Sequence, residues 1–206
     1  MKRLGIKIDG KRTVYALSFF IPFCLLFLLL YALGVYPFGD KTLLISDMQN
    51  QYISYLSYYK TLFTSGNDLF YTFSKNLGGD MTGFAAYYLL SPLNLILLLF
   101  PTRLLPVAVT LIIVLKLSLC GLTFNYLINA ANVPSARSLI FSTTYALMGY
   151  NVVYFFNVMW LDGVALLPLI ALGIQKIISQ KKWLLYMLSL AAALIINYYI
   201  GFMLCI

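Results

Sequence analysis

The chain contains no histidine and no glutamate, and only 10% of its 206 residues are charged. The imidazole base of a Ser-His-Asp triad is therefore absent, and so are histidine ligands for zinc. The cysteines Cys24, Cys120 and Cys205 are isolated within apolar segments and form neither a metal-binding nor a redox pattern. Any acid–base chemistry must therefore use aspartate, tyrosine, lysine or cysteine.

Apolar residues make up 62% of the chain, and the mean hydropathy is +0.90. An ordinary soluble domain is about 45–50% apolar and about 25% charged. A membrane-spanning helix needs about 20 apolar residues, so the chain has room for about five or six spans. The net charge of +8 does not indicate nucleic-acid binding, because the basic residues flank apolar runs, where they orient a membrane protein. We expect an all-α polytopic membrane protein.

Five apolar segments are predicted to cross the bilayer. They cover residues 14–36, 106–130, 138–158, 163–179 and 184–206. A signal peptide is the alternative for the first segment, but the run is too long for a typical h-region and lacks a small-residue exit, so we predict a retained helix. The chain stops inside its last apolar run, which predicts that it is the N-terminal part of a longer protein.

The segment Phe84–Phe100 is apolar but interrupted by Ser91-Pro92, so it permits either five or six spans. Six spans would place Arg137, Lys181 and Lys182 outside, whereas five place them in the cytoplasm with residues 1–13. The five-span topology is therefore favoured, with residues 37–105 as a long outer loop that contains interfacial helices. It puts five aspartates on the outer side: Asp40, Asp47, Asp68, Asp80 and Asp162.

Asp47 begins a stretch with helical periodicity, residues 47–63. One face carries Met48, Tyr52, Tyr55, Tyr59 and Leu62. We expect this helix to lie in the membrane interface with its aromatic face toward the acyl chains. Asp47 either caps the free backbone N–H groups of the helix or is a functional carboxylate that takes a proton or holds a metal. In the functional interpretation, Gln51 one turn later contacts the same ligand.

Two ionisable residues near the later spans are further candidates. Asp162 lies between two predicted spans, either as part of an interfacial turn or as a second carboxylate that shares a divalent cation with Asp47. Lys116 lies near the middle of a span, where a lysine must face protein or water. It is either a structural partner of a polar group or a contact for an anionic lipid head group. Lys41, Lys60 and Lys75 are either solvated charges or phosphate contacts.

Four strings of residues together resemble the YfhO family of bacterial membrane proteins. They are SDMQNQY at 46–52, NLGG at 76–79, YYLLSPLNL at 87–95 and WLDG at 160–163. The third string is the most specific, and the order and spacing match the N-terminal region of that family.

This resemblance implies a C-type glycosyltransferase architecture, in which a first outer loop carries an essential aspartate. It implies a polyprenyl-phosphate sugar as donor, transfer on the extracytoplasmic side and a teichoic-acid-type cell-wall polymer as acceptor. By position Asp47 matches the essential aspartate and Asp162 a second acidic position, while Asp80 follows the Gly-Gly pair.

Two functional hypotheses follow from these patterns. The first is a membrane glycosyltransferase, or part of one, with Asp47 as base or metal ligand, Asp162 assisting, and lysines or a metal holding the lipid phosphate. The second is a non-enzymatic transporter, flippase or assembly partner, which should place ionisable groups and broken helices at mid-membrane. Only Lys116 fits the second pattern, and the clustering of aspartates on one side favours the enzyme.

Overall fold

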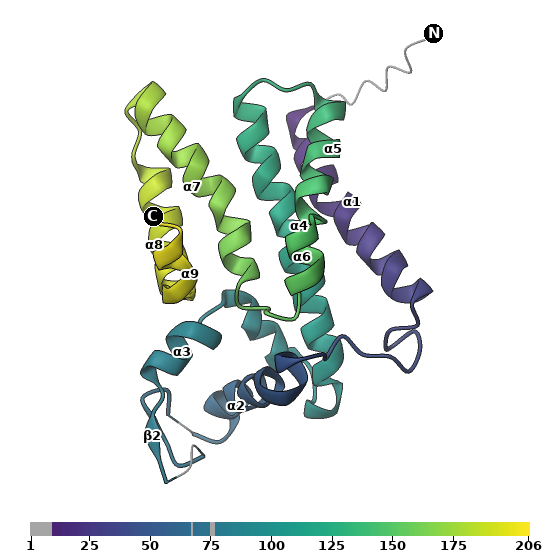
Figure 1. Ribbon diagram of the computed structural model, residues 1–206, viewed down its shortest axis with the longest axis vertical. Coiled ribbons are helices and arrows are strands. Elements are labelled where there is room, and N and C mark those ends of the chain that lie inside the picture. Colours follow the sequence, from purple (N-terminus) through teal and green to yellow (C-terminus); the bar gives the residue numbers. More distant parts are fainter. Residues whose placement is uncertain (1–9, 67, 75–76) are drawn as a thin grey trace.

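A computed structural model describes residues 10–66, 68–74 and 77–206 of the chain (Figure 1). The basic residues before Gly10, together with Lys75 and Asn76, lie outside the described residues. The regular secondary structure of the described part is almost entirely helical, with two short strands, which confirms the predicted all-α membrane fold.

The elements follow one another as a helix, a loop region with short elements, and a series of further helices. In the first half these are α1 (Lys11–Ala32), the π-helix η1 (Met48–Tyr52), α2 (Ile53–Thr64), β1 (Tyr71–Thr72), β2 (Gly79–Asp80), α3 (Thr82–Tyr88), and the 3₁₀ helices η2 (Pro92–Leu99) and η3 (Thr102–Leu104). The second half contains α4 (Leu105–Ala130), α5 (Ser135–Ala146), α6 (Gly149–Tyr154), α7 (Leu161–Gln180), α8 (Leu184–Ile196) and α9 (Tyr198–Met203). The two strands pair antiparallel, with Tyr71 opposite Asp80.

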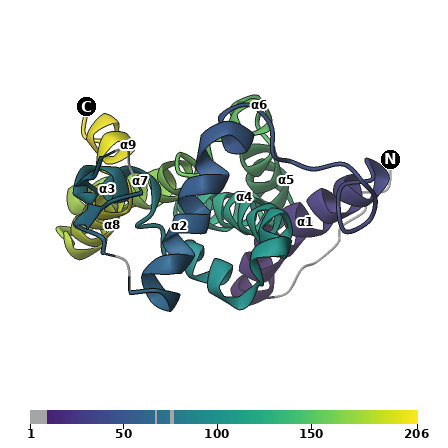
Figure 2. The same cartoon turned by 90° about the horizontal axis from the view of Figure 1, so that it is seen from below.

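Helix α4 is the centre of the bundle and packs against α1, α5 and α7 (Figures 1 and 2). It is apolar on all sides, as expected for a helix surrounded by others. Small residues allow the closest approaches: a Cβ on Gly121 would lie 2.6 Å from the Ser18 carbonyl oxygen of α1, and a Cβ on Gly173 of α7 would lie 2.6 Å from the Cα of Tyr186 in α8. Close backbone contact of this kind is a main source of attraction between helices in a bilayer.

Within the part of the chain that the structure describes, three helices are long and apolar enough to cross a membrane: Lys11–Ala32, Thr102–Ala130 and Leu161–Gln180. They correspond to the predicted spans 14–36, 106–130 and 163–179. The segment Phe84–Phe100 consists of two short helices, α3 and η2, bent by 88° relative to each other, which count as a fourth span only if the bent pair crosses as one. The five-span topology therefore stays a prediction.

The predicted spans 138–158 and 184–206 differ from expectation, because each is broken into two helices rather than formed as one. Buried asparagines explain the breaks. Asn151 donates through Nδ2 to the carbonyl oxygens of Tyr145 (3.2 Å) and Ala146 (2.9 Å), at the end of α5. Asn197 caps α9 by accepting a hydrogen bond from the Ile200 N–H. Side-chain amides thus satisfy backbone groups that a continuous helix would satisfy itself.

The predicted helix after Asp47 is present as η1 and α2, but its orientation in the interface was predicted wrongly. Its aromatic face packs against the protein core and not toward acyl chains: Met48, Tyr52, Leu56 and Tyr59 are buried and join a cluster that includes residues of α4. A lipid-facing surface and a protein-facing surface are both apolar and aromatic, so periodicity alone does not separate them.

Charged residues are distributed unequally between the two ends of the bundle (Figure 1). One end, called here the basic end, has the start of α1, the start of α5 and the α7–α8 connection, with Lys11, Arg12, Arg137, Lys181 and Lys182. The opposite end, called the aspartate end, has η1, α2, the strand pair and the start of α7, and carries Asp47, Asp68, Asp80 and Asp162.

Substitution Asn151→Ala is expected to destabilise the protein. It removes the side-chain donor to the Ala146 carbonyl and one of two donors to the Tyr145 carbonyl at a fully buried position, and an unsatisfied buried group costs about 1–3 kcal/mol. Thermal unfolding of the purified protein in detergent measures the effect. Gln175→Ala, an exposed amide on α7, is the matched control and should leave the midpoint unchanged. Equal midpoints for both variants would contradict the role assigned to Asn151.

Candidate functional site

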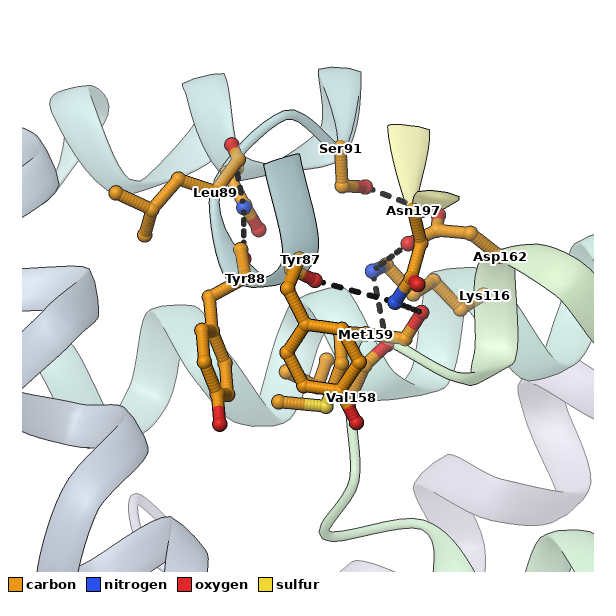
Figure 3. Close-up of polar contacts among 10 residues, drawn as sticks. Tyr87, Tyr88, Leu89, Ser91, Lys116, Val158, Met159, Asp162 and Asn197 are labelled. Carbon is orange, nitrogen blue, oxygen red and sulfur yellow. Dashed lines mark hydrogen bonds and ion pairs between the residues drawn. The ribbon is translucent and has the colours of Figure 1, made fainter. Parts of the chain in front are cut away.

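A buried ion pair lies where α4 and α7 meet near the aspartate end. Lys116 Nζ is 2.6 Å from Asp162 Oδ2, and the two residues are only 1% and 9% exposed (Figure 3). The same ammonium donates to the Val158 carbonyl oxygen at 3.0 Å, and the Ser91 hydroxyl donates to Asp162 Oδ1 at 2.9 Å. Lys116 therefore points into the bundle, which confirms the inward direction predicted for it.

Each residue of this hydrogen-bonded network is placed by the helix or bend to which it belongs. Lys116 lies midway along α4, Asp162 lies in the first turn of α7, where the helix dipole favours a negative charge, and Ser91 lies at the bend between α3 and η2. An unpaired charge in the apolar interior of the bundle is very costly. The helices α4 and α7 and the bend between α3 and η2 are therefore held in the arrangement that keeps the two charges together.

The loop between α6 and α7 gathers further contacts around this ion pair. Asn197 donates through Nδ2 to the carbonyl oxygens of Tyr87 (3.1 Å) and Met159 (3.3 Å). Trp160 Nε1 donates to the Tyr87 hydroxyl at 2.9 Å. Segments that are more than 100 residues apart in sequence, such as those of Tyr87 and Asn197, thus lie side by side (Figure 3).

Asp47 is exposed and lies at the start of η1, but its side chain makes no capping hydrogen bond. The capping interpretation of this residue is therefore wrong. Instead, the Tyr52 hydroxyl lies 3.3 Å from Asp47 Oδ2 and 2.9 Å from the buried Asn157 Oδ1, so its single proton is shared between two acceptors. Tyr52 thus joins Asp47 to the loop that carries Asn157 and leads into the first turn of α7, where Asp162 lies.

Burial and the nearby Asp47 carboxylate both raise the pKa of the Tyr52 phenol above its ordinary value. The phenol consequently stays neutral and keeps its proton at physiological pH. Tyr52 is therefore a donor that orients Asp47, and it does not compete with Asp47 as a base.

The two candidate carboxylates share no direct partner. Asp47 is exposed and contacts Tyr52, whereas both oxygens of Asp162 are engaged by Lys116 and Ser91. Within the described residues, no group of three or more histidine, cysteine or acidic residues gathers in metal-binding geometry. An ammonium occupies the place beside Asp162 that a divalent cation would take, so the geometry offers no support for the cation that the two aspartates were expected to share.

The other predicted site residues lie apart from the ion pair. Gln51 is exposed one turn after Asp47, and Lys41 is exposed in the loop after α1, where its backbone pairs with Val35. Lys60 donates from Nζ to the Phe100 carbonyl oxygen. Asp80 accepts hydrogen bonds from the Thr82 N–H (3.2 Å) and hydroxyl (2.8 Å), which fixes the start of α3.

Three contributors to the site were not predicted: Ser91, Asn157 and Asn197. All three are polar and buried, between 2% and 4% exposed. A polar residue inside or beside an apolar run is the signal that marks them, because such a residue needs a partner within the protein.

The fold and this polar network define a polytopic α-helical membrane protein whose described acidic groups gather toward one end. The chain belongs to the YfhO family: the family model described as "Bacterial membrane protein YfhO" matches residues 18–206. Comparisons with curated proteins and with solved structures give no significant match.

Substitution Lys116→Met is expected to destabilise the protein strongly, because removing one partner of a buried ion pair costs about 3–5 kcal/mol. The readout is the thermal unfolding midpoint in detergent. The double variant Lys116→Met/Asp162→Leu also removes the orphaned carboxylate and should recover most of the loss. A single variant as stable as the unchanged protein would show that the pair contributes nothing to the fold.

Proposed function

We propose that this chain is a membrane glycosyltransferase, or part of one, that moves a sugar from a polyprenyl-phosphate donor to a cell-wall polymer such as teichoic acid on the extracytoplasmic face. Membership of the YfhO family supports the proposal. The observation that carries it is the placement of Asp47: an exposed carboxylate, oriented by Tyr52 and Asn157, at the end of the bundle where the aspartates gather.

In the proposed reaction an acceptor hydroxyl attacks the anomeric carbon of the donor sugar. Asp47 takes the hydroxyl proton as the new C–O bond forms, and the bond from the anomeric carbon to the phosphate oxygen breaks. Polyprenyl phosphate leaves with the bonding electron pair. Asp47 suits this role because it is exposed to a substrate and, unlike Asp162, is paired with no cation among the described residues.

The other polar residues have supporting roles in this proposal. Asp162 assists by holding Lys116 and Ser91, and through them the bend between α3 and η2. Gln51 lies one turn after Asp47 and contacts the same substrate. Lys41 and Lys60 are basic residues of the aspartate end that assist in holding the donor phosphate.

A transporter, flippase or assembly partner is the second candidate, and the structure adds one observation in its favour. The helix pairs α3–η2, α5–α6 and α8–α9 are broken, and a buried ion pair lies between α4 and α7. Broken helices and intramembrane charges are features of transporter sites. The ion pair is internally satisfied, however, whereas Asp47 is exposed at the end, and this favours the enzyme.

We also propose that the protein lies in the bacterial cell membrane with its N-terminus in the cytoplasm. The support is the gathering of basic residues at one end, since such residues are retained on the cytoplasmic side. Cysteines introduced at Ser65 and Ser179 are expected to differ: Ser65→Cys reacts with an impermeant maleimide in intact cells, and Ser179→Cys reacts only after lysis. Labelling of Ser179→Cys from outside would contradict this orientation.

Substitution Asp47→Asn tests the proposed base. Its side chain makes no capping bond, so the fold should be preserved, whereas loss of general-base catalysis lowers the rate by about 10²–10⁴-fold. The measurement is glycosylation of the wall polymer in cells that carry only the variant gene, with membrane expression checked by blot. Asp40→Asn, also exposed and in the loop after α1, is the matched control. Normal glycosylation by well-expressed Asp47→Asn would eliminate Asp47 as the base.

A further inference from the structure

A cavity of about 370 Å³ lies between α2, the strand pair and the start of α3. Its volume is within the range of small-molecule sites, about 300–1,000 Å³. The residues that line it include Ser54, Tyr55, Tyr58, Thr72, Met81 and Phe84. None of these belongs to the ion-pair network or to the residues proposed above for the transfer reaction.

The lining combines two kinds of surface. Tyr55 and Phe84 supply aromatic rings that pack edge to face with their centroids 4.2 Å apart. Ser54, Tyr58 and Thr72 supply hydroxyl groups, and the Tyr58 phenol is held in place by donating to the Asp68 carbonyl oxygen at 3.0 Å. Among the described residues that line the cavity, none is charged. These residues match an uncharged ligand, with an apolar face for the rings and hydroxyls for the polar groups.

A pyranose sugar has this combination, because its axial C–H bonds form apolar patches and its hydroxyls project around the ring. A lipid chain fits less well, since it offers no hydrogen bond to the Ser54 and Thr72 hydroxyls, whereas the Tyr58 hydroxyl already has a partner in the Asp68 carbonyl oxygen. The position of the cavity agrees with this distinction. It lies among α2, α3 and the strand pair at the aspartate end, beyond the ends of α7 and α9 (Figure 1).

The cavity is connected to Asp47 through a series of ring contacts. The Tyr55 ring lies 5.1 Å from the Tyr88 ring, and Tyr88 lies 5.5 Å from Tyr52, whose hydroxyl contacts Asp47. Phe84 packs on Tyr88 as well, at 4.7 Å. A ligand held against Tyr55 and Phe84 is thus placed on the same aromatic cluster that supports Asp47.

We propose that this cavity is a binding site for a neutral pyranose, with Tyr55 and Phe84 contacting the apolar face of the ring and Ser54, Tyr58 and Thr72 bonding its hydroxyls. The inference deepens the proposed function and rests on it for the role of the sugar, which is a unit of either the lipid-linked donor or the acceptor polymer. Binding itself is measured without reference to catalysis.

Saturation-transfer NMR on the purified chain tests the site. The detergent must carry no sugar, for example an amine oxide, because a maltoside head group would compete. The probes are methyl glucoside, methyl galactoside and methyl N-acetylglucosaminide, with methyl glucuronide as the charged comparison. We expect transfer to at least one neutral glycoside and weaker transfer to the glucuronide. A water-soluble isoprenyl phosphate sugar that binds more tightly than its methyl glycoside assigns the site to the donor, and equal binding assigns it to the acceptor.

Three variants localise the binding. Tyr55→Leu is expected to lower the affinity about two- to tenfold, the range for one aromatic contact. Ser54→Val removes an exposed hydroxyl without disturbing the core and should also weaken binding. Tyr126→Leu is the matched control, because this tyrosine also stacks on another ring, that of Tyr15, but belongs to the last turns of α4 near the basic end. It should bind as the unchanged protein does.

Several results would overturn the proposal. One is the absence of transfer to every neutral glycoside. A second is transfer that neither Tyr55→Leu nor Ser54→Val weakens, since the sugar would then bind elsewhere. A third is binding of farnesol, but of no glycoside, that Tyr55→Leu abolishes, which would make the cavity a lipid-chain site. Asp47→Asn separates the two proposals: it should keep sugar binding, and if it also keeps polymer glycosylation, the proposed base fails while the sugar site stands.

Discussion

The arrangement of the aspartate end depends on the buried contact between Lys116 and Asp162. A lysine in the middle of an apolar helix is stable only when its charge is neutralised, and here a carboxylate at 2.6 Å does so. The carboxylate belongs to the first turn of α7 and also accepts a hydrogen bond from Ser91. Three elements from different parts of the chain are thus constrained by one charge, and a displacement of any of them would expose an unpaired ion to an apolar environment.

This constraint extends toward the surface through the segment 157–162. The segment supplies the Val158 carbonyl and Asp162 to Lys116 on one side, and Asn157 to Tyr52 on the other. Tyr52 in turn contacts Asp47. A buried charge pair is therefore linked, through Asn157 and Tyr52, to an exposed carboxylate that pairs with no cation among the described residues. Such a division between a rigid support and an exposed carboxylate suits the proposed catalysis, because reaction rates depend on geometry held before the substrate arrives.

The sequence predicted the features that depend on composition and on the free-energy cost of placing a charged side chain in an apolar environment. The apolar runs predicted the helices, and the position of Lys116 within one of them predicted that its side chain points inward. The partner of Lys116 was not predicted, since Asp162 is 46 residues away and only the packing of α4 on α7 brings the two together. The breaks at Asn151 and Asn197 were missed because hydropathy barely registers one polar residue in an apolar run. The face of α2 was assigned to lipid because burial against protein produces the same aromatic pattern.

The proposed function requires that the aspartate end bring a lipid-linked sugar to Asp47. A cryo-electron microscopy structure of the protein in a nanodisc, with a bound, non-reactive polyprenyl-phosphate sugar analogue, tests this directly. We expect density for the sugar between α2 and α3, with its anomeric carbon facing the Asp47 carboxylate and the isoprenoid chain directed into the bilayer. Density for the sugar at the basic end, or at a position that leaves Asp47 facing only solvent, would contradict it.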